Sequence, residues 1–299
     1  MQYDPFRLMT DPARRTSLPR LAMGLGLAVA LTVGIGQGLL ALAEQVLSAQ
    51  THAALIGQMR RGDTALGMYA LLFSTGAMGM AALITARLVH GRRGRSLLGP
   101  LPLALRQFGR AALALLLIQV LLMGLLMLWP PWPMAAQMLP AMALDRWALL
   151  LPLTLLALLV QTGSEELLFR GYLQSQLAAR LSRPWVWLLL PSALFGLGHW
   201  APGIYGGNAG LVTLWAVLFG LAAADLTART GTLGPALALH LMNNLVAVAV
   251  AAPNGPMTGL ALYILPIDIE DEAMLRAFLP VDLLGIGVGW LAVRLALRV

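Results

Sequence analysis

The chain has 299 residues, of which 59% are hydrophobic and only 11% are charged, against about 45–50% and about 25% in an average soluble domain. This composition excludes an ordinary soluble protein and favours an integral membrane protein. The net charge is +7, but the arginines lie between apolar runs instead of on one face, which argues against nucleic-acid binding, and the lack of cysteine excludes disulfides and cysteine-based sites.

Apolar stretches recur along the chain, several of them close to the roughly 20 residues that cross a bilayer as a helix. The first is too long for the roughly 7–15 residues of a signal-peptide core, so we expect it to be retained, although Ala41-Leu42-Ala43 resembles a cleavage site. We predict an all-α fold, a polytopic transmembrane helical bundle of about eight spans in one membrane domain, residues 1–299. The expected spans are 21–43, 64–84, 111–129, 148–168, 185–200, 211–224, 233–252 and 278–293.

The arginines predict the orientation of the bundle, because arginines near span ends stay preferentially in the cytoplasm. With both termini cytoplasmic, only four arginines lie outside: Arg60, Arg61, Arg146 and Arg276. The acidic segment 268–272 also lies outside. Sixteen arginines then fall on cytoplasmic segments or span ends: Arg7, Arg14, Arg15, Arg20, Arg87, Arg92, Arg93, Arg95, Arg106, Arg110, Arg170, Arg180, Arg183, Arg229, Arg294 and Arg298.

Two adjacent carboxylates, Glu165 and Glu166, follow the uncharged run 148–164. A charge at the centre of a span costs about 2.5–3.5 kcal/mol even on insertion-based scales, so such residues usually face a polar interior. On a helix, Arg170 shares a face with Glu166, whereas Glu165 points about 100° away. We therefore expect Arg170 to pair with Glu166 and to leave Glu165 free. In the alternative, the span ends near residue 164 and both carboxylates are solvated, but the apolar pattern continues towards Arg180.

Two of the four histidines, His199 and His240, lie inside apolar runs. His199 ends the segment 195–199, whose two glycines allow a neighbouring helix to approach closely. Asn244 follows His240 by four residues, so these side chains share one helical face. A single intramembrane histidine is often only an interhelical contact, but two of them with paired carboxylates favour a site. With Glu165 they supply a base, imidazoles for a proton or a metal, and an amide donor for an oxyanion, the components of amide hydrolysis.

At these residues the sequence resembles the family of CAAX-processing and bacteriocin-processing membrane proteases, also called the CPBP or Abi family. The family's motifs are Glu-Glu-x-x-x-Arg, Phe-x-x-x-His and His-x-x-x-Asn or Asp. In this chain they run from Glu165 to Arg170, from Phe195 to His199 and from His240 to Asn244, in the same order and spacing. The resemblance covers residues 148–252, which we expect to be the catalytic core spans.

The resemblance implies four catalytic residues that line one cavity: Glu165, His199, His240 and Asn244. It implies structural support from Glu166 and Arg170. It allows either a metal-bound water or a water activated by Glu165 without metal, and for a Zn²⁺ cofactor the candidate ligands are Glu165, His199 and His240. The sequence contains no His-Glu-x-x-His zinc helix, so any metal would be held by residues from separate spans.

The resulting hypothesis is an endopeptidase that cleaves peptides near the cytoplasmic membrane face. Its partners are the lipid bilayer and a peptide substrate, such as the tail of a prenylated protein or a bacteriocin or leader peptide, with no nucleic acid. The alternatives are a non-catalytic immunity or scaffold protein on the same fold, and a transporter. A rhomboid-type serine protease built on Ser164 is disfavoured, because Glu165 stands where Gly-x-Ser-Gly requires glycine.

Overall fold

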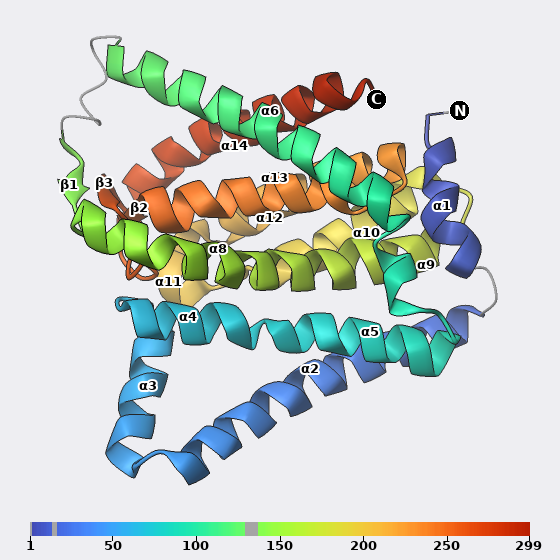
Figure 1. The fold of residues 1–299 in the computed structure, drawn as a ribbon, viewed down its shortest axis with the longest axis horizontal. Coiled ribbons are helices and arrows are strands. Elements are labelled where there is room, and N and C mark those ends of the chain that lie inside the picture. Colours follow the sequence, from blue (N-terminus) through green and yellow to red (C-terminus); the bar gives the residue numbers. More distant parts are fainter. Residues whose placement is uncertain (1, 14–16, 129–136) are drawn as a thin grey trace.

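Helices run back and forth between two ends of the molecule in the computed structural model, which describes residues 2–13, 17–128 and 137–299 (Figure 1). Two apolar helices in the described residues are short, Pro184–Leu197 and Gly234–Val250. Six are long and apolar enough to span a membrane: Leu18–Val46, Ala65–His90, Leu101–Gly124, Leu144–Ala178, Pro202–Thr230 and Glu272–Leu297. The predicted all-α membrane bundle is confirmed, and the chain is an integral multi-pass membrane protein.

The described elements are given in two groups, before and after residues 129–136, which lie outside the described residues. The first part contains η1 (Asp4–Phe6), α1 (Arg7–Thr10), η2 (Asp11–Ala13), α2 (Leu18–Val46), α3 (Ala49–Arg61), α4 (Ala65–Ser74), α5 (Gly76–His90), η3 (Gly94–Leu97) and α6 (Leu101–Leu128). The second part contains β1 (Leu139–Pro140), α8 (Leu144–Glu166), η4 (Leu167–Gln174), α9 (Ser175–Ala178), α10 (Pro184–Leu197), α11 (Pro202–Tyr205), η5 (Gly206–Asn208), α12 (Ala209–Thr230), α13 (Gly234–Asn244), η6 (Leu245–Val250), β2 (Ala251–Asn254), β3 (Tyr263–Asp268) and α14 (Glu272–Leu297).

Helix α3 was not predicted, because hydropathy does not detect a polar helix. Its two ends are nevertheless marked by residues that typically begin and end helices. The Ser48 hydroxyl accepts a hydrogen bond from the Thr51 amide at 3.2 Å and caps the first turn. Gly62 ends the helix with a left-handed φ of 62°, a conformation that glycine adopts without steric cost. In Figure 1, α3 and the adjoining half of α2 diverge from the other helices.

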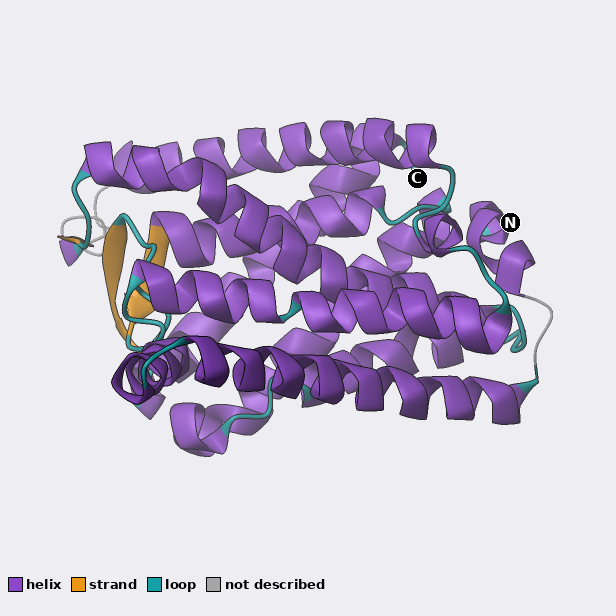
Figure 2. Cartoon of the chain, turned by 60° about the horizontal axis from the view of Figure 1, so that its bottom comes forward, coloured by secondary structure: helices purple, strands orange, loops and turns teal. Residues whose placement is uncertain are grey.

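A small three-stranded sheet, also not predicted, lies at the end opposite the two termini (Figures 1 and 2). Its strand order is β1-β3-β2, with β1 antiparallel and β2 parallel to β3. The predicted seventh span, 233–252, is therefore too long. Its helix ends at Val250, and Ala251 pairs with Tyr263 in the sheet.

The predicted third span, 111–129, begins ten residues too late, because α6 starts at Leu101. Arg106 and Arg110 lowered the local hydropathy, although both are exposed and lie on one face of α6 at a spacing of four residues. Trp129, its predicted end, lies outside the described residues.

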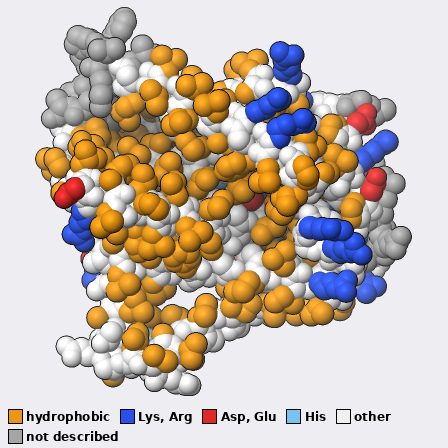
Figure 3. Space-filling view, in the orientation of Figure 1, with side chains coloured by type: hydrophobic (Ala, Val, Ile, Leu, Met, Phe, Trp, Pro, Cys, Tyr) orange, Lys and Arg blue, Asp and Glu red, His pale blue; other side chains and the backbone are white. Residues whose placement is uncertain are grey.

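The two chain termini lie at one end of the bundle (Figure 1), and arginine side chains gather at that end in the space-filling view (Figure 3). We call it the arginine-rich end. Arg170 is an exception to the predicted distribution: it is fully buried inside the bundle, because it pairs with a buried carboxylate. Arg14 and Arg15 lie outside the described residues.

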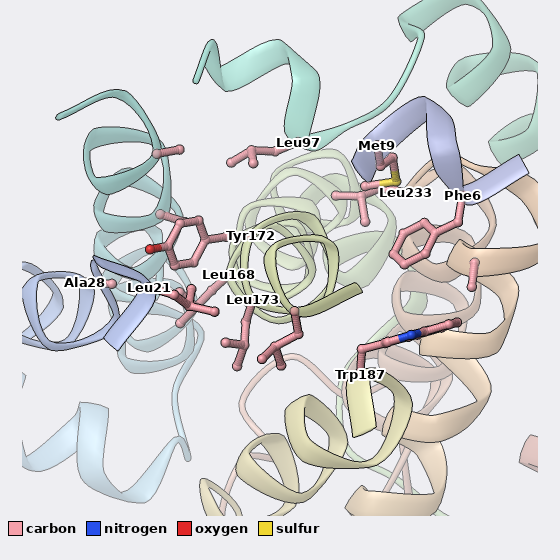
Figure 4. Close-up of a cluster of buried hydrophobic side chains, with 14 residues drawn as sticks. Phe6, Met9, Leu21, Ala28, Leu97, Leu168, Tyr172, Leu173, Trp187 and Leu233 are labelled. Atoms are coloured by element: carbon pink, nitrogen blue, oxygen red, sulfur yellow. The ribbon is translucent and has the colours of Figure 1, made fainter. Parts of the chain in front are cut away.

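A cluster of buried side chains joins the arginine-rich end to the middle of the bundle (Figure 4). Leu168 and Tyr172 of η4 lie between Leu21 of α2 and the side chains of the N-terminal segment. Nearby, the Tyr3 hydroxyl donates to Asp225 on α12 at 2.9 Å. Burial and this hydrogen bond raise the pKa of Tyr3 to about 12, so the phenol stays protonated and remains a donor at neutral pH. The N-terminal segment is thus fastened to the helices that carry the site.

We expect both termini to be cytoplasmic and the segment near Asp271 to lie outside, because arginines gather at the end that holds both termini. Topology reporters fused after Asp271 and after Val299 test this expectation, and the second fusion is the control for expression. A cytoplasmic signal after Asp271 would contradict the orientation.

Candidate active site

The two glutamates lie inside one continuous helix, because α8 passes without a break into η4 and α9. Glu165 is thirteen residues before the end at Ala178, roughly 20 Å at 1.5 Å per residue. The alternative in which the span ends near residue 164 with solvated carboxylates is therefore wrong. The segment η4, directly after Glu166, is π-helical, as is η6 directly after Asn244. π-Helical turns are rare and frequently occur at functional sites.

Glu166 and Arg170 form a fully buried ion pair, as the four-residue spacing predicted. Arg170 Nη1 donates to Glu166 Oε1 at 2.9 Å, and both side chains are 0% exposed. A buried pair stabilises only if further hydrogen bonds offset the loss of hydration. Arg170 makes one of these, from Nη2 to the Gly220 carbonyl on α12 at 3.1 Å. Its guanidinium also lies 4.7 Å from the centre of the Phe195 ring, a favourable cation–π contact. The pair therefore connects α8, α10 and α12.

Gly220 allows α12 to come this close to the ion pair. A Cβ atom at Gly220 would lie 3.0 Å from Ser192 Cβ and 3.2 Å from Arg170 Nη2. A side chain there would push α12 away from α10. Gly196 has a similar role, since its Cβ would lie 2.8 Å from the Thr213 carbonyl. The predicted close helix approach is thus found at Gly196, whereas Gly198 meets only its own turn.

His240 lies between the two carboxylates. Its Nδ1 donates to Glu166 Oε1 at 2.8 Å, and its Nε2 is 3.5 Å from Glu165 Oε2. The imidazole also packs edge-on against the Phe219 ring, with 4.9 Å between ring centres. Because a carboxylate can only accept, Nδ1 carries a proton. The other nitrogen of His240, Nε2, faces Glu165.

Glu165 forms no ion pair with a described arginine, as the sequence predicted, but it does have other polar partners. Its Oε1 accepts from Gln161 Nε2 at 2.7 Å, and Gln161 Oε1 accepts from Asn244 Nδ2 at 2.9 Å. Gln161 thus connects the carboxylate on α8 to the amide on α13. In the described part of the chain, Glu165 Oε2 has no hydrogen-bond partner, and the side chain is 14% exposed. Glu165 therefore has one hydrogen-bonded oxygen and one buried oxygen without a hydrogen bond.

His199 lies just beyond α10, and the Phe195 ring connects it to His240. Its Nδ1 bonds to the Phe195 carbonyl at 2.9 Å, and its ring centre is 4.7 Å from that of Phe195. The Phe195 ring is in turn 5.8 Å from His240. Since a carbonyl only accepts, Nδ1 of His199 is the protonated nitrogen, and Nε2 has a lone pair when the ring is neutral. Among the described residues, no hydrogen bond or ion pair joins His199 to Glu165.

The candidate metal ligands do not form a three-ligand cluster in the described ranges. Glu165 and His240 approach each other, and His199 contacts Phe195, whose ring also contacts His240. Catalytic zinc usually has three protein ligands, so these side chains as placed do not fit such a site. The roles below are therefore derived from the side chains alone.

Residues 146–246 match the family model for Rce1-like proteins, described as type II CAAX prenyl endopeptidase Rce1-like. The segment is similar to this family. The match confirms the resemblance read from the three motifs, and the family is one of endopeptidases. The Rce1-like segment covers about a third of the chain and includes all six motif residues that carry charge or polarity. Neither curated proteins nor solved structures give a match to the chain.

Sequence reasoning missed Gln161, which lies in the Rce1-like segment but belongs to none of the three motifs. A signal for it did exist. Gln161 is a polar residue in an otherwise apolar run, and it precedes Glu165 by four residues, so the two share a helical face. The contact of Gln161 with Asn244 could not be read from spacing, because it joins two helices.

We expect Arg170→Ala to destabilise the protein by about 3–5 kcal/mol, because it leaves Glu166 as an uncompensated buried charge. Thermal unfolding and the folded fraction on size exclusion in detergent measure this loss. Arg183→Ala, a change at the exposed start of α10, is the matched control and should behave like the wild type. A well-folded but inactive Arg170→Ala protein would instead place Arg170 in contact with the substrate.

Proposed function

We propose that the protein is an intramembrane endopeptidase that cleaves peptides near the cytoplasmic membrane face, by a water that Glu165 activates. The observation that carries this proposal is the state of the Glu165 carboxylate. Gln161 fixes Oε1, whereas Oε2 has no partner among the described residues and lies beside His240. Glu166 Oε2 also has no hydrogen-bond partner among the described residues, but the Glu166 side chain is 0% exposed and its Oε1 is bonded to Arg170 and His240, whereas the Glu165 side chain is 14% exposed.

In the proposed reaction, Glu165 Oε2 takes a proton from water, and the resulting hydroxide attacks the carbonyl carbon of the peptide bond. His199 Nε2 accepts a hydrogen bond from the same water and orients it. When the tetrahedral intermediate collapses, the proton on Glu165 passes to the departing amine. This sequence needs one base that later acts as an acid, which is the usual role of a carboxylate in a partly desolvated site.

The developing oxyanion is stabilised from α13. Asn244 uses one amide proton for Gln161 and has a second one to donate. His240 already donates from Nδ1 to Glu166, so it donates to the oxyanion from Nε2 only as an imidazolium.

The depth of Glu165 limits the substrate. A distance of roughly 20 Å from the arginine-rich end corresponds to about six residues of extended chain at about 3.3 Å each. A substrate that enters from this end must therefore supply about six residues in extended conformation, which a terminal or locally unfolded peptide can do. We therefore favour a CAAX-type C-terminal tail, such as that of a prenylated protein, or a bacteriocin or leader peptide.

We expect Glu165→Gln to fold normally and to lose nearly all cleavage of a peptide that the wild type cleaves, because the amide keeps the shape but cannot take a proton. The measurement is product formation by purified protein in lipid nanodiscs. Ser164→Ala is the matched control and should retain activity, since Ser164 packs on Gly79 of α5. Near-wild-type cleavage by Glu165→Gln would show that Glu165 is not the base.

Asn244→Ala should leave a measurable residual activity, reduced by about 10²–10³, the usual cost of one oxyanion donor. The loss should appear in kcat, because the donor acts on the transition state. Asn254→Ala, at the exposed last residue of β2, is the control. A change confined to KM would assign Asn244 to substrate binding instead.

We expect cleavage to survive chelation, because the candidate ligands do not form a three-ligand cluster in the described part of the chain. Treatment with EDTA, followed by metal analysis of the active protein, tests this point. Loss of activity that Zn²⁺ restores would support the alternative, a zinc site on Glu165, His199 and His240.

A further inference from the structure

A cavity of about 390 Å³ lies between α6, α12, α13 and α14. The residues of α13 that line it, Leu239 and Asn243, are the sequence neighbours of His240 and Asn244 and lie on a different face of the helix. Most of the remaining wall is leucine, isoleucine, valine, phenylalanine and alanine. Five side chains with polar atoms also reach the cavity: Gln119, Tyr205, Trp215, Asn243 and Asp282. An apolar cavity with a few convergent polar groups is the usual form of a small-ligand site.

Asp282 is the unusual member of this wall. It lies ten residues after the start of α14, about 15 Å along a helix that is apolar enough to span the membrane. Trp215 lies beside it in the wall, but the indole N–H has no hydrogen-bond partner among the described residues. Asp282 forms no ion pair with any described arginine or histidine, in contrast to Glu166 and Asp225.

The charge of Asp282 is therefore not compensated from within the cavity. The described residues that line it include no arginine or histidine. A carboxylate at membrane depth costs free energy unless a cation accompanies it or it is protonated, and such residues commonly mark a site. A cation that compensates Asp282 must come from a ligand, and the rest of the ligand must be apolar to match the wall.

We propose that this cavity binds a single-chain membrane amphiphile with one amine group, whose ammonium pairs with Asp282 and whose chain lies along the apolar wall. A basic side chain of a peptide substrate fits less well. The groups assigned to catalysis on α13, His240 and Asn244, contact α8, whereas the cavity lies along the face of α13 that carries Leu239 and Asn243. The proposal is independent of the proposed protease activity.

Binding of dodecylamine and of dodecanol to the protein in nanodiscs, corrected for protein-free nanodiscs, tests the proposal. We expect one saturable site that binds the amine more tightly than the alcohol. Asp282→Asn should weaken amine binding by about tenfold or more, the effect of losing one charged hydrogen bond, and should leave alcohol binding unchanged. Asp145→Asn, at an exposed acid on α8, is the matched control and should leave both affinities unchanged.

A cavity-filling variant distinguishes binding in the cavity from binding on the membrane-facing surface of the protein. A Cβ at Gly285 would point into open space, and Gly285 lines the cavity, so Gly285→Leu should abolish binding of both probes without loss of folding. Equal affinity of the wild type for amine and alcohol, or an Asp282→Asn protein that binds the amine as the wild type does, would overturn the proposal. Displacement of the amine by a peptide substrate would also overturn it, because it would assign the cavity to the substrate.

Discussion

The ion pair between Glu166 and Arg170 is the constraint on which the rest of the site depends. Both groups are completely buried, and their partners come from three other segments: His240 on α13, the Gly220 carbonyl on α12 and the Phe195 ring on α10. Each of these contacts supplies part of what the two charges lose when they leave water. The helices can therefore not move apart without exposing an uncompensated charge, and the positions of His240 and Phe195 follow from the pair.

This arrangement also explains why adjacent carboxylates can have different roles. Glu166 is held by a cation and by an imidazole. Among the described residues, Glu165, rotated by about 100° on the helix, contacts the Gln161 amide and the far nitrogen of His240. We therefore assign Glu166 to the fold and Glu165 to catalysis. Helix α13 also carries both groups of residues. His240 and Asn244 belong to the proposed active site, and Leu239 and Asn243 line the apolar cavity.

Much of the fold could be predicted from the sequence, because hydropathy and helical spacing are local properties. The eight apolar helices and the Glu166–Arg170 pair were predicted from runs and from a spacing of four residues. Predictions from local sequence patterns were wrong where contacts between distant parts of the chain determine the structure. Arg170 was assigned to the cytoplasmic side because its buried partners on α12 and α10 are distant in sequence. The sheet that follows the helix end at Val250 requires pairing of Ala251 with Tyr263. The Gln161–Asn244 contact joins two residues that lie 83 positions apart in the sequence. Asp282 was not singled out, because a lone acid has no motif and becomes informative only beside a cavity.

The most direct test of the central claim, that two adjacent glutamates divide catalysis and folding between them, compares Glu165→Gln and Glu166→Gln in one experiment. Cleavage rate and thermal unfolding temperature are measured for both variants in the same nanodiscs. The account predicts that Glu165→Gln keeps the wild-type unfolding temperature and loses cleavage, whereas Glu166→Gln lowers the unfolding temperature because Arg170 and His240 lose their charged partner. Equal destabilisation by the two substitutions, with cleavage retained by Glu165→Gln, would contradict it.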